Sequence, residues 1–214
     1  MKPHASSRFF GSCVIAAIPL TILTWATLEL LRPDHSPLRN MLNEYLVGPF
    51  SFLGRVAGCL LAATFLMLLL GLRFSVRPSG FLTASCVLLG VVVVSLCVSA
   101  AFPADARPPD GSRQIFTWAG IVHIVSAVRF YALLMALLLT LPIAYKRDEK
   151  WRSFSHVTLF LGCLILAIDV GFMLAPLDLR GLVQRGVGLV ILVWLLLTSL
   201  RLRRVIPSTR GTAV

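Results

Sequence analysis

Six predominantly apolar stretches, each long enough to cross a lipid bilayer, follow one another along the chain. A membrane-spanning helix needs about 20 residues, because each residue adds about 1.5 Å along the axis and the hydrocarbon core is about 30 Å thick. The stretches are rich in Leu, Val, Ile and Ala and lack the strict alternation of membrane barrel strands. We therefore predict an all-α, polytopic integral membrane protein, a six-helix transmembrane bundle with helices at about 9–31, 50–72, 81–102, 115–145, 154–177 and 181–200.

The overall composition points to the same class of protein. Hydrophobic residues make up 57% of the chain and charged residues 14%, whereas soluble domains carry about 25% charged residues. The net charge of +11 would suggest nucleic-acid binding in a soluble protein, but here most basic residues lie between the apolar stretches and can orient them in a bilayer. We therefore expect membrane lipids as partners and no nucleic acid.

The distribution of Lys and Arg predicts the orientation. Twelve of the 20 lie in the terminal segments and the two connections on the same side, and five lie in the opposite connections. By the positive-inside rule both termini are cytoplasmic, in a multi-pass protein of the inner (plasma) membrane. The connecting segments are too short to fold alone, so residues 1–214 form one transmembrane domain.

Metal and cofactor sites are not indicated. The five Cys lie within apolar stretches without a Cys-x-x-Cys pair, and the four His lack the spacing of metal ligands. The chain also lacks the phosphate-binding loop, Gly-x-Ser-x-Gly and His-Glu-x-x-His motifs. We expect no metal and no cofactor.

Two charged residues fall deep inside predicted helices. Arg129 is 16 residues from the end of its helix at Tyr145, and Asp169 is 15 residues from the start of the next helix at Phe154. Both would lie at about the same depth on neighbouring helices, and an isolated charge there is costly. We predict an Arg129–Asp169 ion pair, whose structural role of fastening two helices is at least as good an explanation as a catalytic one.

The other ionisable residues within or beside the helices gather in the outer half of the bundle. They could cap separate helix ends, or they could line one polar pocket that opens to the external side and is closed towards the cytoplasm. On the fourth helix, His123, Ser126 and Arg129 would spread over an arc of about 120°, which is wide enough to line a cavity. The residues concerned are Glu29, Glu44, Arg55, Asp105, His123, Asp178 and Arg185.

A ribbon of small residues follows the second helix. Gly54, Gly58 and Ala62 recur every four residues, a spacing that lets another helix approach closely. They would serve packing within the monomer, or alternatively form the seam of a homo-oligomer.

Four short segments resemble a six-helix bacterial and archaeal membrane family known as domain of unknown function 998. The first is RPDHSPLRNMLNEYLVGPFSFLGRVAG after the first helix, followed by FPADARPPDG, AGIVHIV and GLVQRGVGLVILVW. They are similar to the family's Ser-Glu-Tyr-like stretch, Phe-Pro-x-Asp, Gly-x-x-His and Gly-Leu-x-x-Arg, in the same order and between the same helices. The resemblance implies roles for Glu44, Asp105, His123 and Arg185; Asn43 departs from the Ser that the family often has.

Three functions are compatible with these residues. The first is binding or handling of a lipid or other amphiphile. Arg55 or Arg185 would receive an anionic headgroup, and Glu44, Asp105 and His123 would orient its polar part. The second is a membrane-embedded hydrolase or transferase in which His123 is the general base, Asp105 or Glu44 orients it and Arg185 stabilises negative charge. The third is a structural or partner-binding subunit.

Overall fold

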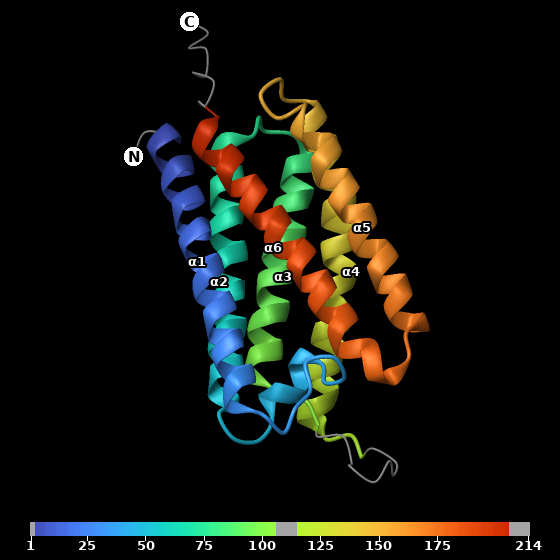
Figure 1. The fold of residues 1–214 in the computed structure, drawn as a ribbon. Helices are drawn as coiled ribbons and strands as arrows, with labels where there is room; N and C mark the ends of the chain where they lie inside the picture. Colours follow the sequence, from blue (N-terminus) through green and yellow to red (C-terminus); the bar gives the residue numbers. More distant parts are fainter. Residues whose placement is uncertain (1–2, 106–114, 206–214) are drawn as a thin grey trace, which may run out of the picture.

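The computed structural model describes residues 3–105 and 115–205, and all regular structure in these residues is helical. Six helices are long and apolar enough to cross a membrane, which confirms the predicted fold class. Two short 3-10 helices, η1 and η2, lie in the connections (Figure 1). The elements in order are α1 (Pro3–Leu31), η1 (Leu42–Leu46), α2 (Ser51–Ser75), α3 (Gly80–Ala101), α4 (Trp118–Lys146), α5 (Phe154–Leu174), η2 (Leu177–Leu179) and α6 (Arg180–Arg204).

The helix boundaries follow local chemistry. The side chains of Ser79 and Thr117 cap α3 and α4, where they accept hydrogen bonds from the third following backbone N–H at 3.2 and 3.1 Å. Helix α5 ends at Leu174, three residues earlier than predicted, because Pro176 cannot continue a helix and η2 follows. Helix α6 continues to Arg204, four residues further than predicted. The prediction followed the apolar stretch, which ends before the basic residues, whereas the helix itself continues through them.

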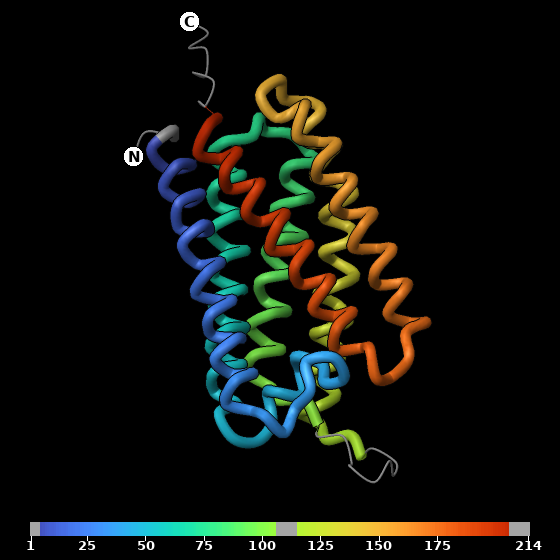
Figure 2. Tube along the Cα trace, viewed as in Figure 1, coloured from blue at the N-terminus to red at the C-terminus, as the bar shows by residue number. Residues whose placement is uncertain are grey.

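The six helices form a closed ring in which each contacts its neighbours in sequence. Helix α6 returns to lie beside α1 and completes the ring, and α2 also contacts α6. Both described chain ends therefore lie at the same end of the bundle (Figures 1 and 2), as an even number of crossings requires. We call this the terminal end, and the opposite end, with segments 32–50, 102–105, 115–117 and 175–179, the long-loop end.

Aromatic and branched side chains fill the middle of the ring. Phe65 of α2 lies with its ring centroid 6.1 Å from that of Phe130 on α4 and 6.4 Å from that of Trp194 on α6. Leu residues of α2 and α4 continue this core towards the terminal end. The centre of the bundle there is packed and apolar.

The α4–α5 connection at the terminal end is held rigidly. The fully buried Trp151 stacks on Tyr145 and donates from Nε1 to Ser75 Oγ at 3.3 Å. Asp148 accepts from the backbone N–H of Arg77 at 2.8 Å. These contacts fasten the α4–α5 connection to the α2–α3 connection beside it.

The ribbon of small residues on α2 packs inside the monomer. A Cβ on Gly54 would lie 2.7 Å from a Leu46 methyl group of η1, and one on Gly58 would lie 3.0 Å from Ala100 Cβ of α3. Ala62 is buried as well. The structure thus uses for internal packing the surface that we considered for a homo-oligomer seam.

Candidate functional site

A cavity of about 150 Å³ lies among the helices towards the long-loop end. Residues of α1, η1, α2, α3, α4 and α6 line it, and most of its wall is apolar, as with Trp25, Leu61 and Phe130. Its polar lining includes Asn43, Ser99, His123, Tyr131 and Gln184. Two residues that the sequence analysis named, His123 and Asn43, both line this cavity.

The His123 side chain joins α4 to the end of α3. It is 1% exposed, and its Nδ1 lies 3.0 Å from the Ser99 carbonyl oxygen and 2.9 Å from that of Phe102. Because carbonyl oxygens only accept, the neutral ring carries its proton on Nδ1 and donates it to these orphan groups of the α3 terminus. The ring's Nε2 is then an acceptor, and among the described residues it has no hydrogen-bond partner.

Asp105 performs the complementary task at the start of α4. Its carboxylate accepts from the backbone N–H of Thr117 at 3.0 Å and from the Thr117 hydroxyl at 2.6 Å. A Cβ on Gly120 would come within 1.8 Å of Asp105 Oδ2, so only glycine admits the carboxylate so close to the helix. The Phe-Pro-x-Asp and Gly-x-x-His segments therefore interlock: each one satisfies the helix terminus of the other.

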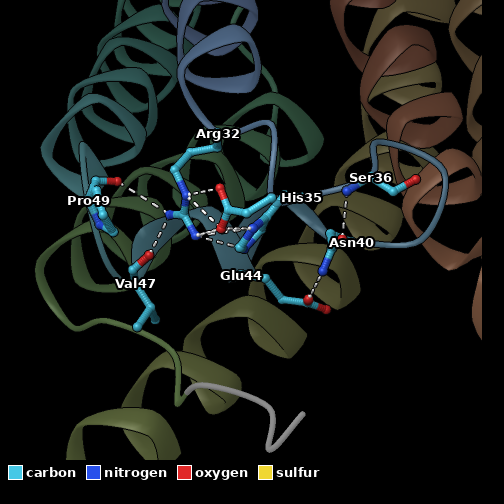
Figure 3. A network of polar contacts seen from close by, with 8 residues as sticks. Arg32, His35, Ser36, Asn40, Glu44, Val47 and Pro49 are labelled. Carbon is cyan, nitrogen blue, oxygen red and sulfur yellow. Dashed lines mark hydrogen bonds and ion pairs between the residues drawn. The ribbon is translucent and has the colours of Figure 1, made fainter.

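Glu44 lies in η1 and stabilises its own loop. Its carboxylate accepts from Asn40 Nδ2 at 2.6 Å (Figure 3). It also accepts from the Met41 backbone N–H at 3.4 Å. None of the hydrogen bonds of the His123 ring goes to Glu44 or to Asp105. The structure does not assemble the proposed acid and base pair, because Nδ1 of His123 is already bonded to backbone carbonyls.

Arg185 ties α6 to α1 and to the first loop. Its Nε and Nη2 donate to Glu29 Oε1 at 2.8 and 2.6 Å, and its Nη1 donates to the carbonyl oxygens of Asn40 and Gly181 at 2.9 and 3.0 Å. The guanidinium also lies 5.7 Å above the ring of the buried Tyr45. Every nitrogen of this side chain has an acceptor, so Arg185 fixes the fold of the long-loop end.

Three of the predicted charged positions lie outside this arrangement. Arg55 is exposed on α2 and has no hydrogen bond or ion pair within residues 3–105 and 115–205. Arg129 donates from Nε to Ser95 Oγ of α3 at 3.0 Å, while Asp169 is half-buried on α5. The predicted Arg129–Asp169 ion pair is not formed, because the two residues share a depth but Arg129 turns towards α3 and not towards α5.

One polar residue with many hydrogen bonds, Arg32, was not among the predicted site residues. Arg32, which is 5% exposed, donates to both oxygens of Asp34 at 2.8–3.2 Å and to the carbonyl oxygens of Val47 and Pro49 at 2.8 and 3.3 Å (Figure 3). Hydrogen bonding to the guanidinium holds the pKa of the Asp34 carboxyl well below its usual range. In the sequence, Arg32 directly follows an apolar stretch and is the first residue of the first family-like segment.

Two amides at the cavity were not among the predicted site residues, although Asn43 was noted as a departure from the family pattern. Gln184 Oε1 accepts from the Leu42 backbone N–H at 2.7 Å and so fastens η1 to α6. Asn43 Oδ1 is buried and has no hydrogen-bond partner among the residues that the structure describes. A buried acceptor without a donor costs about 1–3 kcal/mol, and this one belongs to a side chain that lines the cavity.

The chain was compared with models of known protein families. The model of the family described as Protein of unknown function (DUF998) matches residues 15–201. The chain therefore belongs to this family, and the resemblance seen in the four short segments is confirmed. No curated protein and no solved structure matches the chain. Among residues 3–105 and 115–205, no group of three or more His, Cys, Asp or Glu is placed to hold a metal ion.

Proposed function

We propose that this member of the family binds the polar end of an amphiphile in the cavity at the long-loop end. The observation that carries the proposal is the buried Asn43 Oδ1, which has no hydrogen-bond partner among the described residues and belongs to a side chain that lines a mainly apolar cavity. His123 lines the same cavity, and all its hydrogen bonds use Nδ1, which leaves Nε2 for a ligand. A buried polar group is normally satisfied by the protein or by a bound molecule. A ligand with a hydrogen-bond donor beside a short apolar segment would satisfy Asn43 Oδ1.

The size of the cavity defines which part of the ligand is bound. A cavity of about 150 Å³ accommodates a group of about the size of benzene, and it is smaller than the pockets of about 300–1,000 Å³ that enclose whole small molecules. The hydroxyl end of a lipid-like molecule fits this description. The rest of its chain would leave the cavity and lie among the helices or in the bilayer.

The proposal assigns no anionic headgroup to Arg185, because the donors of that side chain are used by Glu29, Asn40 and Gly181. The acceptors at the cavity instead favour a neutral donor such as a hydroxyl group. Arg55 is exposed near the same end and is available to the phosphate layer of the membrane.

A structural or partner-binding subunit is the second candidate. The caps formed by Asp105 and His123 and the clamp formed by Arg185 and Glu29 favour it, since these groups act within the fold. The hydrolase or transferase alternative would need a carboxylate at His123 Nδ1, where backbone carbonyls lie. Amphiphile binding differs from a structural or partner-binding role in one respect: only amphiphile binding requires the cavity to be filled.

The test compares the molecules that remain bound after purification in native lipid, identified by mass spectrometry. Ala127→Phe would fill the cavity, whereas Ala132→Phe adds the same ring at an exposed position of the same helix. We expect a bound amphiphile in the unaltered protein and in the Ala132→Phe variant and its loss from the Ala127→Phe variant. The same bound molecules in all three proteins would contradict the proposal.

Asn43→Leu provides a sharper variant because the Asn43 amide has no hydrogen bond to lose within the described chain. Replacing it by an apolar side chain of similar size should leave the thermal unfolding temperature of the empty protein unchanged or raise it. The same change should lower the amount of bound amphiphile about tenfold, the effect of about one hydrogen bond. Lower stability with unchanged occupancy would assign Asn43 to the fold instead.

A further inference from the structure

Basic side chains surround an open hollow at the terminal end, far along the helices from the cavity described above. Its volume is about 310 Å³, and it is lined by Lys150, Arg201, Arg204 and Val205. Three of the four lining residues are cations and none is an acid. Their aliphatic stems form most of the wall, and the positive charges around it favour an anion.

The cations come from two elements that are held together. Lys150 belongs to the α4–α5 connection, and Arg201 and Arg204 belong to the last turn of α6. Arg201 Nη2 donates to the Lys150 carbonyl oxygen and to Ser153 Oγ, which fixes the guanidinium beside the connection. The hollow is therefore formed by the fold and not only by a run of basic residues in the sequence.

The carboxylate of the nearby Asp148 is bonded to backbone groups. Both oxygens of Asp148 are engaged by backbone N–H groups, those of Arg77 at 2.8 Å and Lys150 at 2.9 Å. Arg204 is exposed and has no hydrogen bond or ion pair within residues 3–105 and 115–205. Its guanidinium is free to bind a ligand.

The length of α6 indicates that the hollow would reach the depth of the lipid phosphate groups. Helix α6 has 25 residues and is therefore about 37 Å long, which exceeds the hydrocarbon thickness of about 30 Å. Its last turn then reaches the headgroup layer. Cations near a helix C-terminus also stabilise the helix by interacting with its dipole. That effect alone does not require cations from two different elements to line one hollow.

We propose that this hollow is a phosphate-binding site formed by Arg201, Arg204 and Lys150. A planar guanidinium binds two phosphate oxygens at once through a pair of charge-assisted hydrogen bonds, and the Lys150 ammonium adds a point charge. The phosphate belongs either to the headgroup of an anionic lipid or to a small soluble phosphate compound. This site is independent of the cavity and of the function proposed for it.

The neighbouring Arg203 supplies a matched control. A Cβ on Gly11 would lie 3.2 Å from Arg203 Cγ, so the stem of this side chain packs against α1 and away from the hollow. Arg203 and Arg204 are both exposed and belong to the same helical turn. Arg203→Gln and Arg204→Gln therefore remove the same charge, one outside the hollow and one inside it.

The experiment measures ligand adducts of the full-length protein in a neutral detergent by native mass spectrometry. The probes are a short-chain phosphatidylglycerol, the diacylglycerol with the same acyl chains but no phosphate, and inorganic phosphate. We expect Arg204→Gln to weaken binding of phosphatidylglycerol or of inorganic phosphate about tenfold, the effect of losing about one charge-assisted hydrogen bond. Arg203→Gln should change it less than about twofold, since only screened long-range attraction is lost.

The outcomes distinguish a lipid headgroup from a soluble phosphate compound, and a specific site from general attraction by positive charge. Binding of phosphatidylglycerol without binding of inorganic phosphate identifies a lipid headgroup, and binding of both identifies a site for phosphate itself. Arg204→Lys, which keeps the charge but loses the planar fork, should bind with intermediate strength. Equal weakening by Arg203→Gln and Arg204→Gln, or equal binding of phosphatidylglycerol and diacylglycerol, would overturn the proposal. Circular dichroism of each variant confirms that it is folded.

Discussion

Individual charged residues at the long-loop end act mainly on backbone groups of neighbouring segments. Arg32 donates to the carbonyls of Val47 and Pro49, and His123 donates to those of Ser99 and Phe102. A backbone carbonyl left unpaired near the bilayer would cost several kcal/mol. Charged and imidazole groups that reach it through long side chains therefore stabilise irregular backbone where no regular helix is available.

Asp34 gives this arrangement a measurable pH dependence. Hydrogen bonding by Arg32 lowers the pKa of the Asp34 carboxyl, so the ion pair stabilises the loop above the unfolded-state pKa of about 3.9. That contribution is lost only as pH falls through the lower pKa of the folded state. We expect the carboxyl carbon of Asp34, followed by NMR in detergent micelles, to titrate below pH 3.9, and Arg32→Gln to restore an ordinary titration. An ordinary titration in the unaltered protein would show that the ion pair does not persist in solution.

The helices were predictable because the length of an apolar stretch can be counted directly along the sequence. The same holds for the depth of a residue along its helix, but not for the direction in which its side chain points. Arg129 and Asp169 illustrate the difference, since equal depth did not bring them together. His123 was singled out correctly as a buried polar residue, yet its contact with the Phe102 carbonyl depends on how α3 and α4 pack, which no spacing within one helix encodes.

The irregular segments were harder to predict because their contacts are local turns combined with long-range packing. Asn43, Gln184 and Arg32 lie within the family-like segments, but those segments do not show what the three side chains contact. Likewise, η1 covers the cavity only because the Leu42 backbone is fastened to Gln184 of α6. Gly181 lies at the same junction. Its place in a Gly-Leu-x-x-Arg segment was visible in the sequence, but the reason for it is the backbone of the first loop.

At the junction between α6 and the first loop, we expect one added methyl group to have a large effect on the free energy of unfolding. A Cβ on Gly181 would lie 2.5–2.8 Å from the carbonyl oxygens of Pro37, Leu38 and Asn40, whereas nothing lies within 4 Å of one on Gly186. Backbone atoms cannot move aside as a side chain can, so Gly181→Ala should lower the free energy of unfolding by about 1–3 kcal/mol. Gly186→Ala should leave it unchanged or raise it by about 0.5–1 kcal/mol. Thermal unfolding in detergent, followed by circular dichroism, compares the two; equal effects would mean that the loop does not rest on α6.

At the scale of the whole molecule, the two ends of the bundle differ in what they could bind. The long-loop end joins charged side chains to backbone and leaves two acceptors at a small apolar cavity. The terminal end presents cations without lining acids around an open hollow. Because a bilayer holds these ends on opposite sides, any ligands that they bind come from different leaflets or different compartments.

The direction of insertion can therefore be tested directly, and the distribution of Lys and Arg makes a definite prediction. Twelve of the 20 lie on the side of the termini, so that side should be cytoplasmic and the long-loop end external. In a variant without native cysteines, Asp178→Cys places an exposed thiol at the long-loop end, and Glu149→Cys places one at the terminal end. A membrane-impermeant maleimide added to intact cells should label the first, and should label the second only after the membrane is permeabilised. The reverse pattern would place the basic hollow outside, where the attraction of cytoplasmic phosphate compounds could not act on it, while leaving the six-helix ring and its cavity unchanged.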